Sequence, residues 1–271
     1  MGEARWKGKT ALVTGASSGI GEAIARRLAA QGCHVILTAR RRERLEKLRD
    51  ELVAKHGVQA DVIEADLSQT GGADAVFEKV RGLGREVDFL VNNAGLGISG
   101  TFASQTAEDD QVMLQVNVAS LVRLTRLFLP GMLARGAGDV LLISSIAAFL
   151  PIPTFAVYAA TKAFVKGFGE ALAYELRGTG VRVTVACPGG TISEFASVGG
   201  FRKTRAHEMG SMSADHVARI ALRAMARGRR SLVTGWANAL MMALARLLPG
   251  FLRLRAAAVF QRAAGGRASA S

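Results

Sequence analysis

The chain alternates short apolar runs with helix-length segments over most of its length, and this alternation constrains its fold more than any other feature. Near-continuous apolar runs of this kind are what parallel strands need when both faces of their sheet are covered. The runs lie at residues 11–14, 35–39, 58–65, 89–92, 140–144, 181–186 and 231–234. The segments predicted as helices lie at 19–31, 42–55, 72–83, 108–135, 155–177 and 213–227. This order predicts an α/β fold, a doubly wound parallel sheet of about seven strands that binds ligands at the carboxyl ends of its strands.

The length of 271 residues suits one such domain with a large buried core. We see no internal linker and no repeat at a fixed period, so we predict one domain over residues 1–235 and an appended extension over 236–271. Residues 193–212 combine glycines, scattered charges and little periodicity, which predicts a long mobile loop near a site.

The first predicted strand runs directly into a glycine-rich turn, Thr14-Gly15-Ala16-Ser17-Ser18-Gly19-Ile20-Gly21, which opens a helix. Glycines allow the backbone to turn sharply there and to approach a pyrophosphate at the helix N-terminus. A tight turn without a ligand is the alternative, but the amphipathic helix that follows favours a dinucleotide. The candidate cofactor-binding residues in this turn are Gly15, Ser17, Ser18, Gly19, Ile20 and Gly21.

The second predicted strand ends in Thr38-Ala39-Arg40-Arg41-Arg42. NAD-binding sites usually place an acidic residue here to hold the 2′-hydroxyl of the adenosine ribose, and none is present. A guanidinium matches a 2′-phosphate in charge and in fork geometry. We therefore predict NADP(H) rather than NAD(H), selected by Arg40 and Arg41, and interpret Arg42 and Arg44 as solvated charges on a helix.

Two further turns follow predicted strands. Asp66, with Leu67 beside it, could accept a hydrogen bond from the adenine amino group, or could simply cap the end of its strand. Asn93, Ala94 and Gly95 would let the backbone pass close to the adenine ribose, although turn chemistry alone also explains these residues.

Tyr158 and Lys162 lie four residues apart in a predicted helix, which places both side chains on one face. A neighbouring positive charge stabilises a phenolate and lowers the pKa of the phenol, so such a tyrosine can act as a general acid. An ordinary surface pair is the alternative when this spacing is considered by itself.

Taken together and in this order, the motifs resemble the short-chain dehydrogenase/reductase family over about residues 9–234. The set consists of Thr14–Gly21, Asp66, Asn92–Gly95, Asn117, Ser144-Ser145, Tyr158 with Lys162, and Pro188-Gly189. The resemblance implies a Rossmann-type catalytic domain and an NADP(H)-dependent oxidoreductase that interconverts a ketone or aldehyde and an alcohol.

The family pattern also implies roles for individual residues. Tyr158 is the acid/base, Lys162 its partner, and the serine thirteen residues before the tyrosine is Ser145 rather than Ser144. Asn117 matches the asparagine that kinks the long helix and holds a proton-relay water. Pro188, Gly189 and Thr191 match the segment over the nicotinamide, where Ser193 replaces the usual final threonine. A non-catalytic NADP-binding sensor or scaffold is the alternative, but it would show a broken Ser-Tyr-Lys set.

The loops expected around the substrate are largely apolar, which favours a lipophilic ketone or alcohol over a polyol or a charged acid. The alternative is that these side chains only pack on one another. They are Ile98, Phe102, Phe149, Ile152, Phe155 and Phe195.

The net charge of +13 is spread unevenly, because residues 236–271 carry five arginines and no acidic residue. A basic balance can indicate nucleic acid, an anionic membrane or an anionic cofactor. No basic stripe with interleaved aromatic residues is present, so we expect no nucleic-acid partner.

Residues 237–248 are almost wholly apolar but too short to span a bilayer. The stretch 236–264 could lie on an anionic membrane, or it could pack against the body or a second subunit of a homodimer or homotetramer. We expect the last seven residues to be disordered.

The remaining composition favours the cytoplasm, with peripheral attachment to the inner face of a membrane if the extension binds lipid. Cys33 and Cys187 each lie in an apolar run and are expected as buried free thiols. The N-terminus has no apolar signal-peptide core. The four histidines show no metal-ligand spacing, so we expect no metal.

Overall fold

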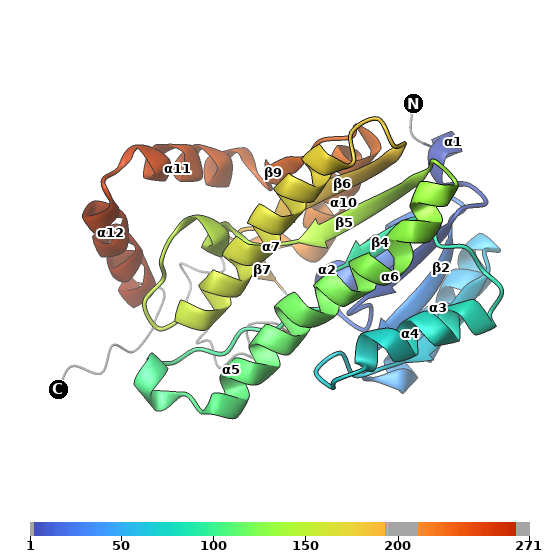
Figure 1. The fold of residues 1–271 in the computed structure, drawn as a ribbon, viewed down its shortest axis with the longest axis horizontal. Coiled ribbons are helices and arrows are strands. Elements are labelled where there is room, and N and C mark those ends of the chain that lie inside the picture. The colour runs from blue at the N-terminus through green and yellow to red at the C-terminus, as the bar shows by residue number, and fades with distance from the viewer. Residues whose placement is uncertain (1–2, 193, 195–210, 264–271) are drawn as a thin grey trace.

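Seven parallel strands form the sheet of this protein, in the order β3-β2-β1-β4-β5-β6-β9 (Figure 1). The computed structural model describes residues 3–192, 194 and 211–263. The strands are β1 (Thr10–Thr14), β2 (His34–Ala39), β3 (Ala60–Glu64), β4 (Phe89–Asn92), β5 (Gly138–Ile143), β6 (Val181–Cys187) and β9 (Ser231–Val233). The predicted doubly wound parallel α/β sheet is confirmed.

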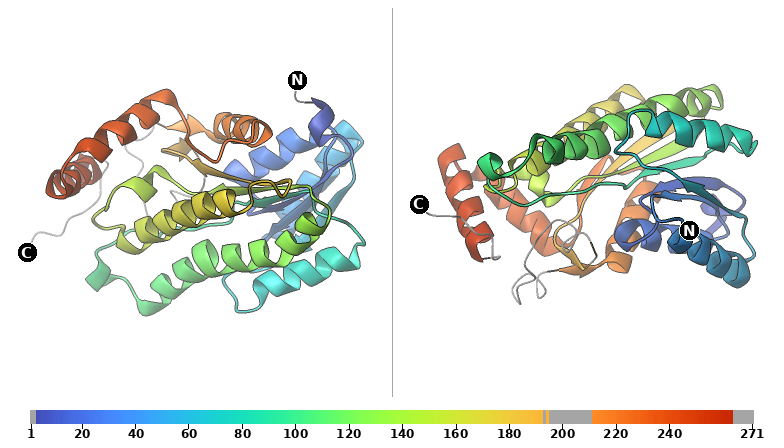
Figure 2. Two further views of the ribbon diagram at one scale, coloured as in Figure 1. Left: turned by 45° about the horizontal axis from the view of Figure 1, so that its top comes forward. Right: turned by 90° about the horizontal axis from the view of Figure 1, so that it is seen from below.

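Helices cover both faces of the sheet, as the two views of Figure 2 show. Successive strand residues point to opposite faces, so Ala11 and Val13 join the core under α2, α3 and α10, whereas Leu12 joins the core under α4, α6 and α7. The helices are α1 (Glu3–Trp6), α2 (Gly19–Ala29), α3 (Arg42–His56), α4 (Gly72–Gly82), α5 (Ala107–Leu114), α6 (Leu121–Ala134), α7 (Ala156–Glu175), α10 (Ala214–Ala226), α11 (Trp236–Leu247) and α12 (Gly250–Ala263). Both cysteines are buried and free.

The strand order reverses between β1 and β4. The chain builds outward from β1 to β3 and then returns to place β4 on the other side of β1. In such sheets the crevice outside the carboxyl ends of the two central strands is where ligands bind. The turns after β1 and β4 therefore face the same crevice.

The helix predicted over 108–135 is interrupted by a short π-helical segment. Thr106 and Asp109 form a capping box at the start of α5, and a π-helical segment, η2 (Gln115–Ser120), connects α5 to α6. Among the described residues, Ala107–Ala134 is the one helix long and apolar enough to cross a membrane. Several apolar side chains of α6, including Leu124 and Met132, are buried in the core against the sheet.

Short elements border the carboxyl edge of the sheet. Two 3-10 turns, η1 (Phe102–Ser104) and η3 (Ile146–Phe149), follow β4 and β5. A two-stranded sheet of β7 (Thr191–Ile192) and β8 (Met212–Ser213) brackets most of the segment predicted as a mobile loop. Most of that loop, and the last seven residues, lie outside the described residues.

Candidate active site

The glycine-rich turn after β1 needs its glycines for both conformation and space. Gly15 and Gly19 have φ values of 65° and 60°, in the left-handed region that favours glycine. A Cβ atom on Gly21 would lie 2.4 Å from the carbonyl oxygen of Gly15 and 2.4 Å from the amide nitrogen of Asn93. The start of α2 therefore packs so closely on the preceding turn that only glycine fits at position 21.

Thr14 and Asn93 join this turn to the turn after β4. The Thr14 hydroxyl accepts hydrogen bonds from the backbone N–H groups of Asn93 and Ala94, both at 2.9 Å, and donates one to Val91 O. The Asn93 amide donates to the carbonyl oxygens of Thr14 and Gly15. Asn93 thus holds the shape of the dinucleotide crevice through its side chain.

Arg41 lies over the serines of the glycine-rich turn. Its guanidinium donates to Ser17 Oγ at 3.2 Å and to Ser18 Oγ at 2.9 Å. The Nη1 atom of the same guanidinium lies 2.7 Å from a carboxylate oxygen of Glu194. Arg40 is exposed just after β2, and the guanidinium that donates to the turn is that of Arg41.

Asp66 and Leu67 stand at the end of β3. Asp66 Oδ1 accepts from the backbone N–H of Ser68 at 2.9 Å and from its hydroxyl at 2.7 Å. Burial opposes ionisation of Asp66, but these hydrogen bonds and the charge of Arg40 prevail and lower its pKa. The Leu67 carbonyl accepts from Ser120. These contacts make Asp66 a strand cap through Oδ1, and hydrogen bonding of its carboxylate to the adenine stays a prediction.

Ser145 and Tyr158 meet at the carboxyl end of β5. Ser145 is the N-cap residue of η3, and its Oγ accepts from the Ala147 N–H at 3.1 Å. Burial raises the pKa of Tyr158 to about 12, and a hydrogen bond between the Ser145 and Tyr158 side chains opposes that rise. Ser144 is turned away, since its buried hydroxyl donates to the carbonyl oxygen of Lys162 at 2.7 Å. Ser145, rather than Ser144, is therefore the serine beside the tyrosine.

Lys162 is almost fully buried on the same face of α7 as Tyr158. Its Nζ atom donates to the carbonyl oxygen of Ile143 at 3.0 Å and lies 5.8 Å from the centre of the Tyr158 ring. Burial lowers the pKa of Lys162 to about 8. Burial of the phenol outweighs any stabilisation by the ammonium, so the lowered tyrosine pKa that we expected is not found in this structure.

Asn117, in the π-helical segment, is buried beside Lys162. Its amide donates to Leu96 O at 2.8 Å and Thr161 Oγ1 at 3.0 Å, and its Oδ1 accepts from the Leu96 N–H. A Cβ atom on Gly95 would lie 3.1 Å from Lys162 Nζ and 3.2 Å from Asn117 Oδ1. The ammonium and the amide oxygen therefore border the same small space, which exists because residue 95 is glycine.

The Pro188-Gly189 turn follows β6 and is held from two sides. The Pro188 carbonyl accepts from the Ile146 N–H at 2.8 Å, and Thr191 Oγ1 donates to Gly189 O. A Cβ atom on Gly189 would lie 2.3 Å from the amide nitrogen of Asn238 in α11. The first turn of α11 thus packs directly on the segment expected over the nicotinamide.

The apolar side chains predicted around the substrate differ in their placement. Phe155 is buried and packs edge-on against Tyr158, with ring centres 5.7 Å apart. Phe102 is 66% exposed. Gly100 N donates to Thr154 O, which joins the loops after β4 and β5. Phe195 lies outside the described residues.

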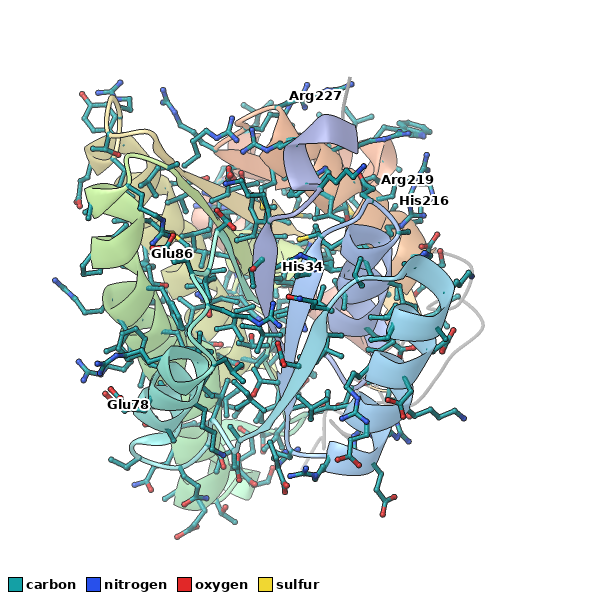
Figure 3. The ribbon with its side chains drawn as sticks, turned by 90° about the vertical axis from the view of Figure 1, so that its right-hand side faces the viewer. His34, Glu78, Glu86, His216, Arg219 and Arg227 are labelled. Atoms are coloured by element: carbon teal, nitrogen blue, oxygen red, sulfur yellow. The ribbon has the colours of Figure 1, made fainter. Side chains whose placement is uncertain are left out.

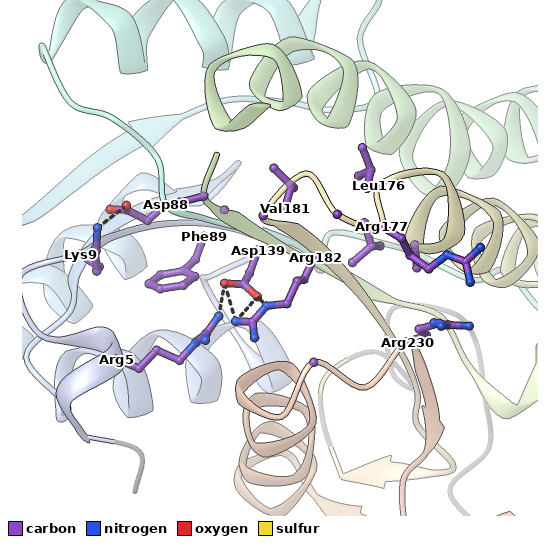
Figure 4. Close-up of a pocket in the computed structure, with 17 residues that line it drawn as sticks. Arg5, Lys9, Asp88, Phe89, Asp139, Leu176, Arg177, Val181, Arg182 and Arg230 are labelled. Carbon is purple, nitrogen blue, oxygen red and sulfur yellow. Dashed lines mark hydrogen bonds and ion pairs between the residues drawn. The ribbon is translucent and has the colours of Figure 1, made fainter. Parts of the chain in front are cut away.

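A cavity of about 630 Å³ opens at the opposite edge of the sheet, at the amino ends of the strands (Figure 4). There the buried Asp139 pairs with Arg5 and Arg182, and Lys9 pairs with Asp88. Burial raises the pKa of Asp139, against the opposing hydrogen bond from Arg5. None of the predicted site residues lines this cavity, which contains ion pairs that stabilise the base of the sheet.

The histidines that the structure describes are spread over separate elements. His34 on β2 accepts from the Gln59 N–H, whereas His216 lies beside Arg219 on α10 (Figure 3). Within residues 3–192, 194 and 211–263, no group of three or more His, Cys, Asp or Glu side chains could hold a metal ion.

Sequence reasoning named Thr14 and Ser144 only as members of their motifs and gave their hydroxyls no role, and it missed Thr161 and Glu194. Thr161 lies inside the Tyr158–Lys162 pentad, where its hydroxyl donates to Tyr158 O and accepts from Asn117. Its position next to Lys162 is a signal that could have found it. Glu194 offered no such signal, because its arginine partners lie about 150 residues earlier in the chain.

A parallel sheet with a glycine-rich turn at its switch point, and a serine, a tyrosine and a lysine at the neighbouring strand end, defines a dinucleotide-dependent oxidoreductase. The family model described as short chain dehydrogenase matches residues 9–199. The chain belongs to the short-chain dehydrogenase/reductase family, as an NAD(P)-dependent dehydrogenase acting on alcohols and ketones.

Individual relatives agree with this assignment. The chain is 41% identical over 191 residues to the NADP-dependent 3-hydroxy acid dehydrogenase YdfG of Salmonella typhi, covering 69% of this chain and 75% of that protein. Among solved structures, a short-chain dehydrogenase from Sphingobium yanoikuyae in complex with NADPH is 30% identical with a TM-score of 0.79, over 89% of this chain and 96% of that one. A 7beta-hydroxysteroid dehydrogenase is 26% identical with a TM-score of 0.86, over 95% and 99% of the two chains.

Proposed function

We propose that this protein reduces a lipophilic ketone or aldehyde with NADPH, and catalyses the reverse oxidation, with Tyr158 as the general acid/base. The observation that carries the proposal is the meeting of Ser145, Tyr158 and Lys162 at the carboxyl end of β5, beside the crevice bordered by the glycine-rich turn. The bound cofactor supplies or accepts the hydride. The chain itself must orient the carbonyl and move one proton.

Each side chain has a step that its geometry suits. The Ser145 hydroxyl holds the substrate oxygen next to Tyr158. Because the phenol has a pKa near 12, it is protonated at neutral pH and can donate its proton to that oxygen. The charge of Lys162, 5.8 Å from the ring centre, then stabilises the phenolate.

Asn117 completes the proposed proton path. Its Oδ1 accepts one hydrogen bond, from Leu96, and a carbonyl oxygen has a second lone pair. A water between Oδ1 and Lys162 Nζ would have both an acceptor and a donor, so we assign to Asn117 and Lys162 the return of the proton to Tyr158.

The cofactor contacts follow the same crevice. Backbone groups of the glycine-rich turn, from Gly15 to Gly21, would hold the pyrophosphate at the N-terminus of α2. Arg40 and Arg41 would hold the 2′-phosphate. The relatives named above as NADP-dependent or in complex with NADPH support NADP(H) as the preferred cofactor.

The direct test is a panel of ketones, aldehydes and alcohols with NADPH, NADH and their oxidised forms. We expect turnover of bulky apolar carbonyls. Steroid ketones belong in the panel because a structural relative is a 7beta-hydroxysteroid dehydrogenase. We also expect a higher kcat/KM with NADPH than with NADH. Binding of NADPH without turnover of any member would instead favour the non-catalytic sensor.

We propose further that α11 and α12 rest on an anionic membrane surface, with the protein in the cytoplasm at the inner face of that membrane. Met242 is the buried anchor of α11, and a stripe of large apolar side chains on its other side faces solvent. These are Trp236, Leu240, Leu244 and Leu247, with Phe251 and Leu254 continuing on α12. A helix with an exposed apolar stripe and basic residues suits the boundary between headgroups and acyl chains.

Charge favours a membrane over a second copy of the chain. Residues 236–271 hold five arginines and no acidic residue. A twofold interface through this surface would bring two basic extensions together with no acidic residue in either of them. The surface also lies next to the site, because α11 contacts η3 and packs on Gly189.

Vesicle flotation tests this surface on the full chain. We expect binding to vesicles containing phosphatidylglycerol, weaker binding to pure phosphatidylcholine, and loss of binding when Leu240 and Leu244 are both replaced by serine. Leu83→Ser, at an exposed leucine next to α4, is the control that should keep binding. No flotation, together with a dimer that the double variant dissociates, would show that a second copy covers this surface instead. That the protein forms a dimer or tetramer through another face is a separate prediction, which analytical ultracentrifugation would test.

A further inference from the structure

We infer that Glu194 is a specificity-determining residue of the cofactor site, which weakens the binding of NADP by competing with its 2′-phosphate for Arg41 and Arg44. This inference rests on the proposed function, in which arginines after β2 hold that phosphate. Glu194 lies two residues after the end of β7, and its side chain reaches Arg41 and Arg44, about 150 residues earlier in the chain.

The Glu194 carboxylate pairs with both arginines at once. Oε2 lies 2.7 Å from Arg41 Nη1, and the two carboxylate oxygens lie 2.8 and 2.9 Å from Arg44 Nη1. Arg44 was interpreted from sequence as a solvated helix charge, but the structure joins it to this cluster. The pairs hold Glu194 in its charged form, since hydrogen bonds from Arg44 and then Arg41 lower its pKa.

The remaining donors of Arg41 are directed at the glycine-rich turn. Its Nε and Nη2 atoms reach the Ser17 and Ser18 hydroxyls. A phosphate that is to bind the guanidinium must therefore replace either these hydroxyls or the carboxylate. A carboxylate and a phosphate dianion repel one another, so the two anions exclude each other from the same arginine.

The carboxylate lies beside the glycine-rich turn that borders the cofactor crevice. Glu194 lines a cavity of about 370 Å³ together with Ser18, Gly19 and Arg44, at the N-terminus of α2. An NAD molecule carries a hydroxyl in place of the 2′-phosphate and needs no such displacement. Glu194 should consequently penalise NADP and leave NAD nearly unaffected.

The test compares dissociation constants of NADPH and NADH, measured by nucleotide fluorescence, for the parent protein and Glu194→Gln. Because exposed ion pairs contribute modestly, we expect about three- to tenfold tighter NADPH binding and less than twofold change for NADH. Glu51→Gln is the matched control, since it removes the same charge from a two-bond pair with Arg26. This control should leave both constants unchanged.

A double variant separates the competition from a general charge effect. When Arg41 is already replaced by alanine, Glu194→Gln should tighten NADPH binding by a smaller factor than in the parent. Unchanged or weaker NADPH binding by Glu194→Gln, or an equal gain for Glu51→Gln, would overturn the inference. Failure of the proposed NADP preference is a different result, because it would appear in the parent protein as equal affinities for NADPH and NADH.

Discussion

The ammonium of Lys162 donates to the carbonyl oxygen of Ile143 at 3.0 Å, at a distance of 5.8 Å from the centre of the Tyr158 ring. Ile143, the last residue of β5, therefore holds the side chain of Lys162, which lies one helical turn after Tyr158. This contact ties the acid/base pair to the rigid sheet rather than to a loop. A site built in this way keeps its geometry before substrate arrives.

The buried ammonium predicts a pH dependence of stability. The folded pKa of Lys162, about 8, lies below its ordinary value of 10.5. Between these two values the unfolded chain binds more protons than the folded one, so the contribution of Lys162 to the free energy of unfolding increases as the pH rises from 8 to 10.5. We expect the stability difference between the parent and Lys162→Met to shift by up to about 3 kcal/mol over this range, measured by urea unfolding. A flat difference would contradict the lowered pKa.

Arg40 and Arg41 predict the nucleotide preference of the enzyme. Removing either guanidinium should raise the KM for NADPH far more than that for NADH, because only the former carries a 2′-phosphate. We expect the larger effect from Arg41→Ala, which also contacts Ser17 and Ser18. Steady-state kinetics with both nucleotides measure this, and equal effects on the two would remove these residues from the role.

The close packing around Gly21 predicts that a methyl group at this position is destabilising, and Gly167 provides a matched control. A methyl group there meets a backbone carbonyl at 2.4 Å, so Gly21→Ala should lower the free energy of unfolding by about 1–3 kcal/mol and weaken NADPH binding. Gly167 lies within α7 with no atom close to an added Cβ. Gly167→Ala should raise stability by up to about 1 kcal/mol. Equal behaviour of the two variants in thermal unfolding would argue against the close packing of the turn.

The neighbouring serines should separate catalysis from stability. Ser145→Ala removes the hydroxyl beside Tyr158, and we expect kcat to fall by about 10²-fold. Ser144→Ala leaves the Lys162 carbonyl without its buried donor and should mainly lower the free energy of unfolding, by about 1–2 kcal/mol. Kinetics and urea unfolding on both variants measure this, and a larger loss of kcat in Ser144→Ala would exchange the two roles.

The sequence was sufficient where a local pattern carries the information. The seven apolar runs predicted the seven parallel strands, because a strand covered on both faces must be apolar throughout. The turn after β1 and the pair Tyr158–Lys162 could likewise be found from sequence, because the residues of each motif lie close together in the chain.

What sequence reasoning missed depends on contacts between distant segments. Glu194 reaches Arg41 across the fold, and the use of the Asn93 amide as a brace depends on β1 and β4 being neighbours. The kink of the long helix at Asn117 was expected only through the family resemblance, because a π-helical turn has no single-residue signature. The raised pKa of Tyr158 follows from burial by surrounding segments such as Phe155, so it required the packed structure.

The central claim is that Tyr158 transfers the proton during NADPH-dependent carbonyl reduction, and Tyr158→Phe tests it most directly. The substitution removes one oxygen and keeps the ring that packs on Phe155. Measured on the best ketone of the panel, kcat should fall by at least about 10²-fold, while the dissociation constant of NADPH stays within about twofold of the parent value. Turnover by Tyr158→Phe at the rate of the parent enzyme would contradict the mechanism.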